Sequence, residues 1–168
     1  FEYPLIEALK VKQIEKIFIS TDCPVILKKS KRYKVDYVKR PKNLANKKAL
    51  GEDVFQHAYF NILKKENITS NHIEAIVLLF ANGATVNKNL IMKGIKTLLK
   101  NKKFDSAVSV SKYNMWSPLR ARKLNKDGSL IPFVPFETFG NPKTLNCDRD
   151  SQGDVLFADM GVSVVRPK

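Results

Sequence analysis

The clearest structural pattern in this sequence lies in residues 75–110, which read AIVLLFANGATVNKNLIMKGIKTLLKNKKFDSAVSV. Residues 75–80 are an apolar run of strand length, and we expect both faces of that strand to be covered. A helix should follow, because Asn87 is a candidate N-cap and apolar residues then recur at helical spacing: Leu90, Ile91, Ile95, Leu98 and Leu99. Residues 106–110 form a second strand-like run. A strand, a helix and another strand in this order predict a crossover unit of a parallel sheet.

The same alternation extends toward the N-terminus. We expect helices over residues 3–13, over residues 24–32 and from Asp53 onward, with short strands over residues 16–20 and 36–38. The helix that starts at Asp53 carries an apolar stripe made of Val54, Phe55, Ala58, Tyr59, Ile62 and Leu63. This order predicts an α/β fold with a mainly parallel sheet between helices. Such a sheet normally opens with a strand, whereas this sequence opens with a helix, as if a first strand and its loop were missing.

Residues 112–153 differ from the rest in composition. They are rich in Pro, Asn, Asp and aromatic residues, they have no helical period, and Lys126-Asp127-Gly128 is a hairpin-turn signal. We expect strands and loops that leave the edge of the sheet, inserted within a single domain over residues 1–168. Residues 155–165 then return to strand-like sequence.

Composition narrows the possible partners. The 168 residues carry a net charge of +14, but 24 of the 30 basic residues are Lys, spread over the whole chain. This pattern favours a solvated lysine-rich surface over a nucleic-acid interface, which leans on clustered Arg. No apolar run approaches the roughly 20 residues of a membrane span. Cys23 and Cys147 are far apart and form no Cys-x-x-Cys pair, which argues against a zinc site or a disulfide framework and favours a reducing, cytoplasmic location. We therefore expect neither a nucleic-acid nor a membrane partner.

Ligands of an open parallel sheet bind beyond the carboxyl ends of its strands. Three segments should lie there, namely residues 20–22, residues 40–41 and residues 81–85. The Arg40 guanidinium is suited to a phosphate, although it would equally serve as a solvated surface group. Asn82 can hydrogen-bond a polar ligand and Gly83 permits close backbone approach, although Asn-Gly is also ordinary turn chemistry.

Other polar residues carry weaker signals. Arg120, Arg122 and Arg149 lie in the inserted segment, where each could bind a carboxylate or form a surface ion pair. His57 lies beside an apolar helical stripe, where a packing or surface role is favoured over catalysis. No nucleophile and base can be paired from the sequence, so no catalytic residue is assigned.

Several segments together resemble the acylneuraminate cytidylyltransferase family, the CMP-sialic acid synthetases. Their order and spacing match over nearly the whole chain. They are Ile19-Ser20-Thr21-Asp22, Arg40-Pro41-x-x-Leu44-Ala45, Asp53-Val54-x-x-His57-Ala58, Leu78-Leu79 leading into Ala81–Thr85, Asp105-Ser106-Ala107-Val108-Ser109-Val110, and Gly161 within Phe157–Val165.

The resemblance implies a Rossmann-like three-layer nucleotidyltransferase fold and a homodimer, with residues 112–153 as a β-rich dimerisation arm. It implies transfer of CMP from CTP to an acidic nine-carbon sugar, with release of pyrophosphate and assistance from Mg²⁺. By position, Arg40, Asn82 and Gly83 match nucleotide-binding residues. Arg120 and Arg149 match residues that face the acidic sugar.

The sequence also departs from the family pattern. The family's first strand and triphosphate loop would precede Phe1, and its metal-binding aspartates would follow Lys168. We therefore expect no metal ligand within these residues, and we expect the chain by itself to be inactive. Phe80-Ala81-Asn82-Gly83 stands where many members have Gln-Pro-Thr-Ser. These departures leave two alternatives open: a cytidylyltransferase for another ulosonic acid, and a non-catalytic relative that lacks the triphosphate loop.

Overall fold

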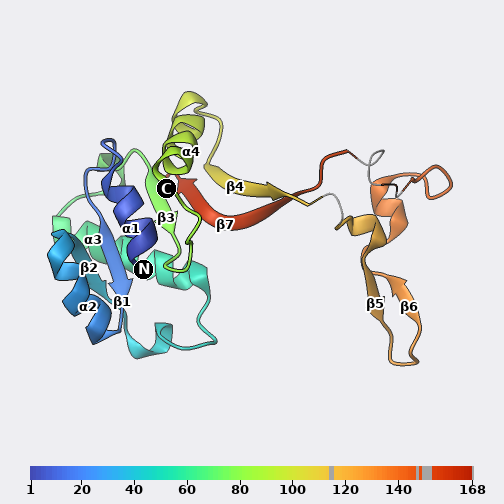
Figure 1. The fold of residues 1–168 in the computed structure, drawn as a ribbon, viewed down its shortest axis with the longest axis horizontal. Coiled ribbons are helices and arrows are strands. Elements are labelled where there is room, and N and C mark those ends of the chain that lie inside the picture. Colours follow the sequence, from blue (N-terminus) through green and yellow to red (C-terminus); the bar gives the residue numbers. More distant parts are fainter. Residues whose placement is uncertain (114–115, 147, 149–152, 168) are drawn as a thin grey trace. The chain divides into compact units, whose positions relative to one another are not determined.

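The computed structural model describes residues 1–113, 116–146, 148 and 153–167 (Figure 1). Helices and strands alternate along the chain, with short 3-10 turns between them. The helices are α1 (Glu2–Leu9), α2 (Pro24–Ser30), α3 (Gly51–Glu66) and α4 (Lys88–Lys100). The strands are β1 (Phe18–Thr21), β2 (Asp36–Lys39), β3 (Ile76–Leu79), β4 (Ser106–Lys112), β5 (Arg122–Leu124), β6 (Leu130–Pro132) and β7 (Leu156–Val165).

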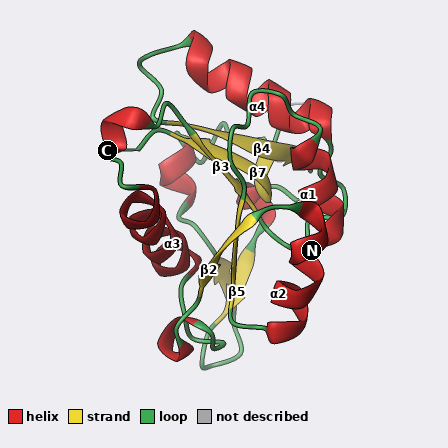
Figure 2. Cartoon of the chain, turned by 90° about the vertical axis from the view of Figure 1, so that its left-hand side faces the viewer, coloured by secondary structure: helices red, strands yellow, loops and turns green. Residues whose placement is uncertain are grey.

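The chain divides into two compact units. The first comprises residues 1–109 and 160–168, and the second comprises residues 110–159, which include the predicted arm over residues 112–153. The first unit contains helices on both sides of its strands, with α3 on one side and α1 and α2 on the other (Figure 2). The mixed α/β class that the sequence predicts is therefore confirmed.

The strands of the first unit form two separate sheets. β1 and β2 are parallel, with Phe18 opposite Asp36 and Thr21 opposite Lys39. In the second sheet the order is β3-β7-β4, and β3 is antiparallel to β7 with Ile76 opposite Val165. Because β7 returns between them, β3 and β4 are not neighbours.

The prediction of a mainly parallel sheet is therefore wrong, because β3 and β7 are antiparallel. The crossover through α4 does connect β3 to β4, as the strand–helix–strand pattern predicts. The strand-like run at residues 155–165 also forms a strand, but it pairs with β3, from Leu79 opposite Val162 to Ile76 opposite Val165, and these partners lie far apart in the chain. A local periodicity does not reveal such a long-range antiparallel partner, because pairing depends on tertiary packing.

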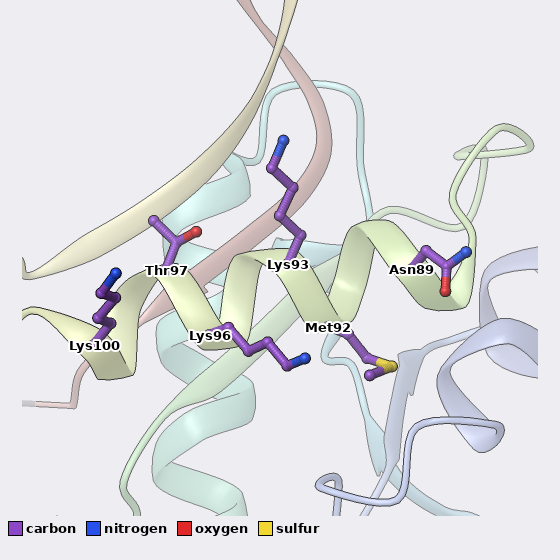
Figure 3. A pocket seen from close by; sticks show the side chains of 6 residues that line it. All are labelled: Asn89, Met92, Lys93, Lys96, Thr97 and Lys100. Atoms are coloured by element: carbon purple, nitrogen blue, oxygen red, sulfur yellow. The ribbon is translucent and has the colours of Figure 1, made fainter.

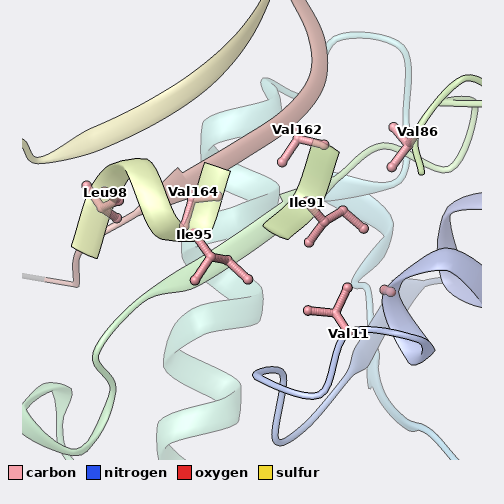
Figure 4. Close-up of a cluster of buried hydrophobic side chains, with 8 residues drawn as sticks. Val11, Val86, Ile91, Ile95, Leu98, Val162 and Val164 are labelled. Atoms are coloured by element: carbon pink, nitrogen blue, oxygen red, sulfur yellow. The ribbon is translucent and has the colours of Figure 1, made fainter. Parts of the chain in front are cut away.

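The core of the first unit lies between α4, β7 and the end of α1 (Figure 4). Ile91 and Leu98 are completely buried, which confirms the predicted stripe of α4, and Val164 of β7 is completely buried in the same cluster. Asn87 caps that helix as expected, since its side chain accepts a 3.0 Å hydrogen bond from the Leu90 N–H. This face of the unit is closely packed.

The face toward α3 is packed less completely. None of the residues of α3 is fully buried, although its apolar stripe forms the predicted helical face. All four residues of β3 are likewise only half-buried. Residues 75–80, which we expect to be covered on both faces, are thus all half-buried.

The second unit contains a small hairpin. β5 and β6 are antiparallel, with Arg122 opposite Pro132, and the predicted turn closes through Gly128 at φ +83°. Gly suits this left-handed position because it carries no Cβ. Among the described residues, no helix has both the length and the apolar character to cross a membrane.

Candidate functional site

The carboxyl edge of the β1–β2 pair brings together two of the three predicted segments. The Arg40 backbone N–H donates a 3.0 Å hydrogen bond to the Thr21 carbonyl oxygen, which extends the parallel ladder by one step past β2. Residues 20–22 and residues 40–41 therefore lie side by side, as parallel pairing predicts.

The Arg40 side chain turns back over the end of β1. Its Nη2 donates a 2.8 Å hydrogen bond to the Ser20 carbonyl oxygen, and its Nε lies 3.4 Å from Ser20 Oγ. The Ile17 carbonyl accepts a hydrogen bond from the Asp36 N–H at the start of β2, and the Thr21 carbonyl accepts one from the Arg40 N–H just after β2. Since successive peptide groups of a strand alternate in direction, the Ser20 carbonyl points away from β2. Arg40 thus reaches the edge of β1 that has no strand partner.

The charge of Arg40 is not neutralised by a salt bridge among the described residues. The side chain is half-buried, and its hydrogen bonds go to a neutral carbonyl and a hydroxyl. A guanidinium has five N–H donors, so further donors stay available for an anion. This arrangement fits a phosphate or carboxylate group at the edge of the sheet.

Thr21 fixes the course of the chain beside Arg40. It is buried, and its Oγ1 accepts a 3.1 Å hydrogen bond from the Cys23 N–H. This bond makes a local side-chain turn, after which Pro24 begins α2 with the fixed φ that suits a first helical turn. Sequence reasoning did not single out this role of Thr21, although a Thr two residues before the N-cap of a helix, here Cys23, is the signal that indicates it.

The loop after β3 contains the other two predicted nucleotide-binding residues. Asn82 is exposed, and Gly83 donates its N–H to the Phe80 carbonyl oxygen at 3.0 Å. A Cβ on Gly83 would lie 3.0 Å from Val86 Cγ2 and 3.2 Å from that same carbonyl. Close packing in the turn therefore explains Gly83, and within the described chain no hydrogen bond joins this loop to Arg40.

The predicted sugar-binding arginines belong to the second unit or lie outside the described residues. Arg120 is exposed at the end of a 3-10 turn (Pro118–Arg120), where its N–H donates to the Ser117 carbonyl oxygen at 2.9 Å. Arg122 stacks 5.1 Å from the ring centre of Phe136 and donates hydrogen bonds to two main-chain oxygens. Arg149 lies outside the described residues.

Two surface hollows occur elsewhere on the first unit. The larger, about 410 Å³, runs along α4 and is lined by Asn89, Met92, Lys93, Lys96, Thr97 and Lys100 (Figure 3). The other, about 320 Å³, lies at the amino ends of β1 and β2 and includes Lys16 and Asp36. Neither of these two hollows is lined by Arg40, Asn82 or Gly83.

Magnesium has no evident ligand set in the described part of the chain. No three His, Cys, Asp or Glu side chains gather there in a way that could hold a metal ion. Mg²⁺ prefers carboxylate oxygens together with substrate phosphates.

Helix α3 contains two buried polar atoms, one on His57, for which the sequence favours a packing or surface role, and one on Tyr59, which it places in the apolar stripe. His57 Nδ1 and the Tyr59 hydroxyl are both inaccessible to solvent and have no hydrogen-bond partner among the described residues. Buried polar groups are nearly always paired, so these two atoms mark a place where a partner is expected.

Comparison with known proteins gives no family assignment: no family model matches the chain, and no curated protein matches it.

Proposed function

We propose that this chain is part of a cytidylyltransferase that joins CMP from CTP to an acidic, sialic-acid-like nonulosonic sugar. The observation that supports it most directly is the Arg40 guanidinium, held at the carboxyl edge of β1 and β2 without a carboxylate partner. This is the position that the family resemblance assigns to an arginine near the nucleotide.

The proposed reaction is a nucleotidyl transfer. The anomeric hydroxyl oxygen of the sugar forms a bond to the α-phosphorus of CTP, the bond from that phosphorus to the bridging oxygen breaks, and pyrophosphate leaves with that oxygen. The hydroxyl proton passes to solvent. Arg40 would bind phosphate oxygens by charge-assisted hydrogen bonds, with Asn82 and Gly83 in the loop that meets the nucleotide. Arg120 and Arg149 would face the sugar carboxylate, and Mg²⁺ would screen the triphosphate when bound.

The finer features of the fold belong to the same proposal. A Rossmann-like three-layer arrangement agrees with a parallel β1–β2 pair that has helices on both sides. A homodimer built through the second unit agrees with the large apolar side chains exposed there, including Trp116 at 68%, Leu124 at 71% and Leu130 at 67%. A cytoplasmic location agrees with the sparse use of cysteine.

The test is release of pyrophosphate by the complete gene product. The protein is incubated with CTP, Mg²⁺ and one acidic sugar at a time: N-acetylneuraminate, other nonulosonates, and an eight-carbon ulosonic acid. Pyrophosphate with a nine-carbon sugar supports the proposal. Preference for the eight-carbon acid would favour the alternative cytidylyltransferase. CTP binding without pyrophosphate from any sugar would favour a non-catalytic relative.

A further inference from the structure

The hollow of about 410 Å³ along α4 has the form of a groove between two rows of side chains. In each row the residues recur every four positions: Asn89, Lys93 and Thr97 form one row, and Met92, Lys96 and Lys100 form the other (Figure 3). Such rows are the ridges of a helix surface, and a ridge of a second helix packs into the groove between them. The hollow therefore has the form of a helix-docking groove.

The groove lies on the face of α4 that the core does not use. On the inner face, Ile91, Ile95 and Leu98 have exposed fractions of 7% or less and belong to the apolar cluster of the first unit. On the outer face, Lys93 and Lys96 are exposed, as are Asn89, Thr97 and Lys100. The fold therefore needs only one side of this helix, and the other side is accessible to another molecule.

The groove is strongly basic. None of Lys93, Lys96 and Lys100 forms a salt bridge within the described part of the chain. Lys93 and Lys96 extend to opposite sides of the helix, so positive charge flanks the groove on both sides (Figure 3). Residues 88–104 contain no Asp or Glu that could offset this charge. The complementary acidic charge is best supplied by another protein, since a second copy of this chain would bring a net charge of +14.

The composition of α4 favours a protein partner over a nucleic acid or a membrane. The helix contains no Arg and no aromatic residue, which supply the planar hydrogen bonding and the base stacking of nucleic-acid surfaces. None of its large apolar side chains is exposed, so it has no apolar face to insert into lipid. The half-buried Met92 instead offers the groove an adaptable apolar contact, which suits an apolar side chain of a partner helix.

We propose that the outer face of α4 is a docking surface for an acidic amphipathic helix of another protein. One ridge of the partner helix enters the groove, where its apolar side chains contact Met92 and the aliphatic stems of the lysines. Carboxylates on the two flanks of that ridge pair with the lysines. Glu or Asp side chains four positions apart lie about 6 Å from one another along the helix axis, which is also the axial spacing of Lys96 and Lys100.

This inference is independent of the proposed nucleotide chemistry. The groove is not lined by Arg40, Asn82 or Gly83, and its lysines play no part in the proposed reaction. Failure of the docking experiment below would leave the pyrophosphate assay unaffected, and failure of that assay would leave the docking surface unaffected.

The test uses a synthetic acidic peptide as the probe and the full chain as the receptor. The peptide has about 18 residues, which is long enough to form a helix, and carries Glu every four residues on both flanks of a Leu stripe. The control peptide has the same composition in an order that scatters Glu and Leu around the helix. Fluorescence anisotropy at low salt gives the Kd. The striped peptide should bind at least about tenfold more tightly than the scattered one, and equal binding of the two would overturn the proposal.

Two double variants of equal charge locate the site. Lys93→Glu with Lys96→Glu reverses the charge on both sides of the groove and should raise the Kd for the striped peptide by at least about tenfold. Lys47→Glu with Lys48→Glu makes the same change in net charge at two exposed loop residues and should leave the Kd nearly unchanged. Equal losses in the two double variants would refute the docking surface, because the attraction would then come from net charge alone. Lys96→Gln, a milder change on the exposed face of the helix, should raise the Kd by roughly two- to fivefold.

The other classes of polyanion are tested in the same assay. Single-stranded RNA and vesicles that contain anionic lipid should bind more weakly than the striped peptide, and the variant with Lys93→Glu and Lys96→Glu should affect them no more than the loop variant does. Tighter binding of either polyanion, lost specifically when Lys93 and Lys96 are reversed, would contradict the assignment of the groove to an acidic helix.

Discussion

Replacing Arg40 by alanine separates its structural role from its proposed role in binding. In the structure its guanidinium makes one hydrogen bond of 2.8 Å to the Ser20 carbonyl and a longer contact of 3.4 Å to the hydroxyl. Both groups lie at an open strand edge, where water can replace the lost donor. Arg40→Ala should therefore lower the free energy of unfolding by only about 0.5–1.5 kcal/mol.

The effect on CTP should be larger. A charge-assisted hydrogen bond to phosphate contributes about 1.5–3 kcal/mol, which corresponds to a rise of roughly 10- to 150-fold in the Kd for CTP. Arg40→Lys should give a smaller rise, because it keeps the charge and loses the planar fork. The measurement is calorimetric titration of the complete gene product with CTP.

Arg32→Ala is the matched control for this experiment. Arg32 is also an arginine of the first unit, but it pairs with Glu2 and lies 4.9 Å from the ring centre of Tyr33. It should leave the Kd for CTP unchanged. If Arg40→Ala and Arg32→Ala bind CTP equally well, the assignment of Arg40 to the nucleotide is refuted.

Three further predictions concern stability. Leu98→Ala removes a completely buried side chain and should lower the free energy of unfolding in urea by about 2–5 kcal/mol, whereas truncating the exposed Leu50 should change it little. Gly94→Ala should destabilise the protein in the same assay despite the better helix propensity of Ala, because the new Cβ would lie 2.9 Å from Val164 Cγ2; a stabilised variant would contradict that packing. Hydrogen bonds from the Lys10 ammonium and then from the Lys88 backbone N–H hold the pKa of Glu7 below its ordinary value of 4.5. A carboxyl with a lowered folded pKa stabilises the fold above its unfolded pKa and loses that contribution as the pH falls through the folded value. Thermal unfolding of Glu7→Gln should therefore depend less on pH below 4.5 than the parent protein, and identical pH dependence would count against the interaction.

The parts of the fold that could be predicted from the sequence are those that local patterns determine. The spacing of Ile91, Ile95 and Leu98 predicts both the length and the buried face of α4, and Asn87 predicts its start. The turn at Lys126-Asp127-Gly128 predicts the β5–β6 hairpin. Boundaries are less accurate: the first helix ends at Leu9 and not at residue 13, and α3 begins at Gly51, two residues before Asp53.

Long-range pairing could not be predicted in the same way. The apolar run over residues 155–165 predicts a strand but contains no information about its neighbours. Its position is set by close packing, in which Gly94 on α4 leaves room for Val164. Arg166 then fixes the end of β7, since its side chain donates a 2.8 Å hydrogen bond to the Leu98 carbonyl at the end of α4. None of these contacts follows from a period of two or of 3.6 residues.

The candidate site also contains one part that the order of elements predicts and one part that depends on long-range packing. Parallel pairing of β1 and β2 brings Ser20 and Arg40 together, as the order of elements predicts. The loop with Asn82 follows a strand of the other sheet. Its distance from Arg40 is therefore set by the packing between the two sheets, which no local period in the sequence determines.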